Sequence, residues 1–217
     1  MKLIRAARVA GVSALAAGLY SFFVLRSFYF QFAGSTDPQP LAEGSLWQWG
    51  IGGWLWLLAI FSWMVFLVVL KHRYSPVHRI STTIQSGLIS IAATLLIVGV
   101  LIGMNRFRMQ EVMNGDPQIE ALYVAAMLVE QFSLAALAAG LLMGGGVTTW
   151  ICIDLVLMEK LPTSWMVPGA VAGLLSILTP LLTPELRHLL IALLAYCVWC
   201  LVLGLRGSVP EAYPELE

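Results

Sequence analysis

Residues 46–70 read LWQWGIGGWLWLLAIFSWMVFLVVL, without one charged side chain. A helix needs roughly 20 mostly apolar residues to cross a hydrocarbon core of about 30 Å. Inside that core every backbone polar group must be satisfied within the segment, and at this length a helix does so. The run therefore predicts a transmembrane helix and places the chain among integral membrane proteins.

The composition agrees with this class. Hydrophobic residues make up 59% of the chain and charged residues 11%, and the mean hydropathy is +0.86. Soluble domains carry about 25% charged residues, and a soluble protein this apolar would expose aggregation-prone patches. The formal net charge is zero, so we expect the lipid bilayer, and no nucleic acid, as a partner.

Outward from residues 46–70, further apolar runs predict an all-α polytopic transmembrane bundle in a single membrane domain, residues 1–217, with about six spans. The expected spans are residues 6–25, 46–70, 81–104, 132–157, 167–182 and 188–205. Residues 6–25 imitate a secretory signal, but we expect them to be retained as the first span. Two stretches rich in turn-forming and charged residues, 33–45 and 105–120, are expected to be loops.

The stretch 121–158 allows two interpretations. As one straight helix it would be about 57 Å long at 1.5 Å per residue, nearly twice the core thickness. We expect residues 118–131 to protrude or lie amphipathically, with the span proper at 132–157. The alternative is a break at Gly144–Gly146, followed by a re-entrant segment.

The distribution of Lys and Arg predicts the orientation, because short cytoplasmic loops carry an excess of them. With the N-terminus inside, the cytoplasmic segments hold Lys2, Arg5, Arg8, Lys71, Arg73, Arg79, Lys160 and Arg206. The opposite side holds Arg26, Arg106, Arg108 and Arg187. We therefore expect both termini in the cytoplasm, in an inner (plasma) membrane of bacterial type. The segment KHRYSPVHR, residues 71–79, is expected to lie in water as a solvated charge run.

Three polar side chains within apolar stretches are candidates for function: Glu130, Gln131 and Asp154. Ionisable groups inside a membrane are costly and mark pathways or proton relays by default. Alternatively, Glu130 has no function in transport and lies at the membrane–water interface on the side opposite the cytoplasm. This alternative agrees better with a span at residues 132–157. Asp154 is expected near the cytoplasmic interface, paired with Lys160 or a neighbouring helix.

Cys197 and Cys200 form a C-x-x-C pair within the last span. The i, i+3 spacing puts both sulfurs on one helix face, as in membrane thiol oxidoreductases. The pair lies near mid-span, however, and Cys152 is the only other cysteine, so inert buried thiols are the favoured interpretation. No cluster of metal ligands is expected, because the histidines lie in basic or terminal positions.

Trp49, Trp56 and Trp63 recur at intervals of seven along residues 46–70. Such a stripe can hold a lipid, pigment or quinone, although no cofactor is required by it. Interfacial anchoring and helix packing explain the same residues, and either way this face is the expected contact surface. Small-x-x-x-small frames, which allow close helix approach, occur at Gly99–Gly103, Gly140–Gly144 and Gly169–Gly173.

No nucleotide-binding loop, zinc-protease helix or serine elbow occurs, so an enzyme is not expected. The preferred hypothesis is a non-enzymatic membrane subunit or assembly partner, associating with other membrane proteins or with itself. The alternative is a small transporter or channel with Glu130 and Asp154 on a polar path. A weaker alternative is a thiol or quinone oxidoreductase using Cys197 and Cys200.

Overall fold

The computed structural model describes residues 2–25, 45–75, 80–113, 119–182 and 186–205. The secondary structure of these ranges is helical, which confirms the all-α class. The helices are α1 (Lys2–Phe23), α3 (Ser45–Tyr74), α4 (Ile80–Met113), α5 (Ile119–Leu157), α6 (Thr163–Leu182) and α7 (Leu186–Leu205).

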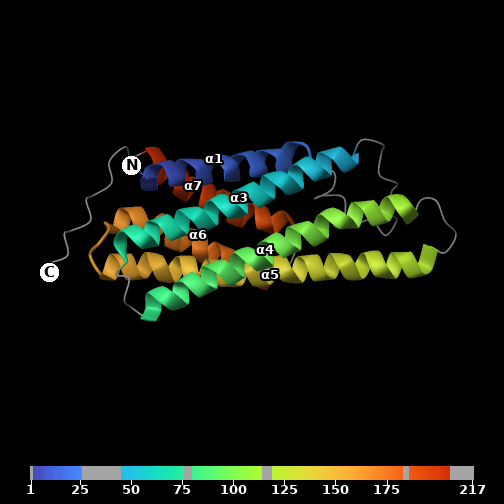
Figure 1. Cartoon of the computed structure of the whole chain (residues 1–217). Helices are drawn as coiled ribbons and strands as arrows, with labels where there is room; N and C mark the ends of the chain where they lie inside the picture. Colours follow the sequence, from blue (N-terminus) through green and yellow to red (C-terminus); the bar gives the residue numbers. More distant parts are fainter. Residues whose placement is uncertain (1, 26–44, 76–79, 114–118, 183–185, 206–217) are drawn as a thin grey trace.

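The helices run antiparallel to their neighbours and form a closed ring (Figure 1). Each helix packs against the next one in the chain, and α7 returns to pack against α1. The most extensive contact joins α4 to α5, and the next joins α5 to α6. Direct contact across the ring is slight, between α3 and α5. The interior is therefore filled by side chains that all six helices contribute.

Five of the helices are long and apolar enough to cross a membrane, judged by length and composition: α1, α3, α4, α5 and α6. The apolar part of α7 that the structure describes, Leu189–Leu205, is shorter than these spans. A polytopic membrane protein is thus supported by the helices themselves.

Two helices extend past the ends that hydropathy predicts. Helix α3 continues to Tyr74, just before Pro76 in the sequence, and α4 continues to Met113. A loop was expected over residues 105–120, but residues 105–113 belong to helix α4. The next helix, α5, begins at Ile119. Charged side chains end an apolar run, but Arg, Gln, Glu and Met are good helix formers, so they do not end the helix.

Helix α5 is continuous through Gly144–Gly146, so the alternative with a break at these glycines is wrong. Residues 119–131 belong to the same helix as the span that follows them. A break inside the hydrocarbon core would leave backbone groups without partners, whereas the continuous helix satisfies them.

The turn between α5 and α6 is tight. Glu159 adopts φ 55°, its N–H donates to Val156 O, and the Lys160 N–H donates to Leu155 O. These two hydrogen bonds form a Schellman motif, which ends the helix and satisfies its last carbonyls. Pro162 follows, and α6 begins directly after it. The turn places α6 antiparallel to α5, against its glycine face.

Candidate functional site

The glycine frames of α4 and α5 meet each other. A Cβ added at Gly99 would lie 2.6 Å from Leu137 Cγ, and one at Gly140 would lie 2.7 Å from Leu96 Cγ. At Gly103 the nearest atom would be Ser133 Oγ, at 3.0 Å. The Ser133 hydroxyl donates to the Gly99 carbonyl at 2.8 Å, which ties the two helices together. This pairing explains why α4 and α5 share the most extensive contact.

A second close approach joins α5 to α6. A Cβ at Gly145 would lie 2.5 Å from the Gly173 carbonyl oxygen, and one at Gly173 would lie 2.7 Å from the Gly145 carbonyl oxygen. A Cβ at Gly169 would meet the indole of Trp199 and, at 2.7 Å, the Cys152 sulfur. Backbone therefore packs directly on backbone here, as small residues allow in lipid.

The tryptophan stripe of α3 faces the interior of the ring. The Trp49 indole donates to Gly103 O of α4 at 3.3 Å, and the Trp56 indole donates to Ser21 Oγ of α1 at 2.9 Å. Trp63 is 8% exposed and belongs to the core. The three side chains thus connect α3 to both of its neighbours and to the centre.

Two small apolar cavities follow this stripe, with volumes of about 50 Å³ and 60 Å³. Trp49 lines the first, Trp63 lines the second, and Trp56, Leu137 and Leu189 line both. Because a water molecule occupies about 30 Å³ of liquid, each cavity has room for about two waters or a short stretch of hydrocarbon. Binding of a lipid tail, pigment or quinone along the stripe stays a prediction.

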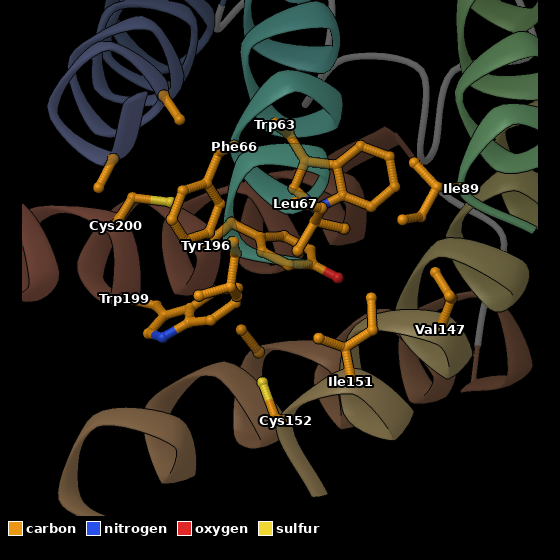
Figure 2. Packing of buried hydrophobic residues seen from close by; sticks show 14 of the residues in the cluster. Trp63, Phe66, Leu67, Ile89, Val147, Ile151, Cys152, Tyr196, Trp199 and Cys200 are labelled. Atoms are coloured by element: carbon orange, nitrogen blue, oxygen red, sulfur yellow. The ribbon is translucent and has the colours of Figure 1, made fainter. Parts of the chain in front are cut away.

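Trp63, the last tryptophan of the stripe along α3, packs against Tyr196 of α7. Their rings form an edge contact with centroids 6.0 Å apart, and Figure 2 shows the indole nitrogen on the side of the ring nearer to Tyr196. Among the residues that the structure describes, this nitrogen is a buried donor without a hydrogen-bond partner. The Tyr196 hydroxyl donates to Thr148 Oγ1 at 3.1 Å. The centre is therefore an aromatic cluster with one side-chain hydrogen bond, between Tyr196 and Thr148.

The structure does not bring the ionisable candidates together. Glu130 is half-buried at the edge of the first cavity, and its neighbour Gln131 is exposed. Asp154 accepts a hydrogen bond of 2.7 Å from the buried amide of Gln85 on the neighbouring helix α4, which is one of the two partners expected for it. Glu130 and Asp154 lie 24 residues apart on α5, about 36 Å at 1.5 Å per residue. Along the face between them, α5 presents Leu137 and small residues to the cavities.

The three cysteines are buried free thiols. The Cys197 thiol donates to the Gly11 carbonyl of α1 at 3.4 Å, so it lies in the α1–α7 contact. Cys200 lines the second cavity, while Cys152 packs near Gly169 on the far side of Trp199. Burial of this kind suits packing and keeps soluble redox partners away from the sulfurs.

Two residues of the charge run 71–79 are buried instead of lying in water: Tyr74, which is 3% exposed, and Lys71. Lys71 is 5% exposed, and its ammonium group donates to Thr82 O and Ser86 Oγ of α4. The periodicity carried the signal: continuing the buried positions Trp63, Leu67 and Leu70 at helical spacing beyond the apolar run places Lys71 on the inner face. His78 and Arg79, from the same charge run, lie outside the described residues.

Comparisons of the chain with protein families, with curated proteins and with solved structures find no match.

Proposed function

We propose that the chain is a non-enzymatic subunit or assembly partner of a membrane complex. In this proposal α7 is a sixth span, and both termini face the cytoplasm of a bacterial-type plasma membrane. The eight Lys and Arg residues assigned above to the cytoplasmic side, against four on the other, support this orientation.

The observation that carries the proposal is the apolar interior along the tryptophan stripe. The described residues along the tryptophan stripe leave small apolar spaces, of about 50 and 60 Å³. A transporter or channel needs polar groups at successive depths, whereas Glu130 and Asp154 are far apart on α5 with apolar packing between them. An interior of this kind supports a role in packing and assembly over one in conduction.

Helix α4 offers the face that a partner helix would use. Thr83, Gly87, Ser90 and Thr94 follow the spacing i, i+4, i+7, i+11, and all four are exposed. The Thr94 hydroxyl donates back to the Ser90 carbonyl at 2.9 Å. Of the apolar window of α4, 28% is buried, against 44% for α1, α3 and α5. Small and hydroxyl residues that face lipid along one stripe are typical of helix-association surfaces.

Replacing Gly87 by Leu should separate assembly from folding. No atom of the chain lies within 4 Å of a Cβ at this position, so the fold should change in stability by no more than about 0.5 kcal/mol. The larger side chain should nevertheless block close approach of a partner helix. We expect the complex extracted from native membranes to lose mass on a native gel, while yield stays at the parent level.

The matched control is Gly50→Leu on α3, where a Cβ also meets nothing within 4 Å. This variant should keep the parent complex. A parent chain that migrates from native membranes as a 23.7-kDa monomer would contradict the assembly proposal.

A second test addresses transport through Glu130. Glu130→Gln keeps the size and hydrogen bonding of the side chain but removes the titratable proton. We expect no proton flux from the parent chain in liposomes, and hence no change in flux in the variant. A proton current in the parent that Glu130→Gln abolishes would favour the transporter hypothesis instead.

A further inference from the structure

The end of α3 and the start of α4 enclose the largest of the cavities discussed here, about 280 Å³. It has room for roughly nine water molecules at about 30 Å³ each. The lining consists of one apolar residue and six that carry nitrogen or oxygen. These residues are Val68, Lys71, His72, Ser75, Thr82, Thr83 and Ser86. Among the residues that the structure describes here, the lining is basic and hydroxylic, without a carboxylate.

Lys71 gives the cavity a buried positive charge. The side chain is 95% buried, and both of its hydrogen-bond acceptors, Thr82 O and Ser86 Oγ, are neutral. An ammonium group has three donors, so one remains after these two bonds. A buried charge is costly unless an opposite charge compensates it. The Asp154 carboxylate at this end of the bundle accepts a hydrogen bond from Gln85. The hydrogen bonds of Lys71 go instead to Thr82 and Ser86 of α4.

The start of α4 adds to the same potential. The helix begins at Ile80 and has no acidic residue in its first turn. Its first backbone N–H groups lack intrahelical acceptors, and the helix dipole puts partial positive charge there. The N-terminus of α1, with Lys2 and Arg5, lies at the same end of the bundle (Figure 1). An anion in the cavity would meet favourable charge from Lys71 and from the start of α4.

The position of the cavity favours a lipid as the source of the anion. It lies where the apolar windows of α3 and α4 end, at Tyr74 and Ile80, which is the depth of the headgroups in a bilayer. Val68 in its wall is half exposed, and Ile84 on the neighbouring turn of α4 is also exposed, so the rim is apolar where acyl chains would continue.

We infer that this cavity binds the phosphate of an anionic phospholipid, with the Lys71 ammonium and the Thr83 hydroxyl as its contacts. Thr83 also belongs to the α4 face proposed for a partner helix, so the test uses the purified chain alone. The lysine supplies a charge-assisted hydrogen bond to phosphate, the Thr83 hydroxyl adds a neutral one, and the acyl chains leave over the apolar rim.

The test compares the purified full chain in vesicles of phosphatidylcholine with and without phosphatidylglycerol. The parent should melt at a higher temperature with phosphatidylglycerol, and Lys71→Met should weaken the apparent lipid affinity about tenfold, as expected for the loss of a charge-assisted contact. Arg73→Met removes the same charge two residues away, from a side chain stacked on Tyr74, and should keep the parent affinity.

Thr83→Val provides a second variant if Lys71→Met does not fold, because Thr83 is exposed and its loss costs the fold little. It too should lower the affinity for phosphatidylglycerol. Equal lipid responses in the parent, Lys71→Met and Thr83→Val would overturn the inference. So would inorganic phosphate in phosphatidylcholine vesicles giving the full stabilisation, since the site would then serve a soluble anion.

Discussion

Gly145→Leu is expected to prevent α5 from packing against α6 and to abolish recovery of folded protein. Even a single Cβ at this position would lie 2.5 Å from the Gly173 carbonyl oxygen and 2.9 Å from Ser176 Cβ. The first of these contacts is with backbone, which cannot rotate away, so the two helices would have to separate. We expect a loss of about 3 kcal/mol or more, the upper end of the range for overpacking. Monodispersity on gel filtration and unfolding in SDS measure it.

The neighbouring glycine supplies the control. A Cβ at Gly146 meets nothing within 4 Å, so Gly146→Leu should be recovered at the parent level. The two variants place the same side chain at adjacent positions of one helix, so helix propensity and hydrophobicity are matched. Equal recovery of both would show that the α5–α6 contact in solution is not the one described.

Trp199→Ala is expected to have the second large effect. The side chain is 0% exposed, its ring forms an edge contact with Phe66 at 5.0 Å between centroids, and its N–H donates to Trp165 O at 3.1 Å. Removal leaves a cavity between α3, α6 and α7 and deletes the hydrogen bond to Trp165 O. Losses of about 3–5 kcal/mol are typical of Trp→Ala in a core. SDS titration of the purified variant measures the change.

Trp54→Ala controls for the chemistry of the substitution. Trp54 is 67% exposed on the outer side of α3, so its loss should change the free energy of unfolding by no more than about 0.5 kcal/mol. If both variants were destabilised alike, Trp199 would not hold the core position that Figure 2 gives it.

The helices were predictable from the sequence because a bilayer imposes a minimum length on each apolar run. Residues 46–70 and 81–104 lie within α3 and α4. The ends of the helices were less predictable. Hydropathy shows where the apolar run ends at a charged residue, but it does not show where the backbone hydrogen bonds of the helix end. Lys71 illustrates the difference: it lies one residue beyond the apolar run, and the continuing helix turns it inward.

The sequence does not predict which helix faces pack together. The spacing of small residues shows that a helix can be approached closely, but it does not identify the helix that approaches. Gly99–Gly103 and Gly140–Gly144 are equivalent patterns in the sequence, but in the structure Gly99 faces Leu137, Gly140 faces Leu96, and Gly144 faces Trp63. Gly173 instead meets Gly145, which lies outside any of the predicted frames. For the same reason the sequence does not reveal that Asp154 is held by Gln85, 69 residues away.

The closure of the ring by α1 and α7 has a consequence for biosynthesis. Helix α1 is synthesised before α7 and must wait for it, and roughly 10–40 s pass between them at about 5–20 residues per second. During that interval the inner face of α1 lies against lipid, with Arg8 still lacking the Gly204 carbonyl that accepts its hydrogen bond of 2.8 Å. Ala7, Ala10 and Ala14 on that face are as compatible with acyl chains as with protein. The waiting helix is therefore not exposed to aggregation, and the order of synthesis is compatible with a ring.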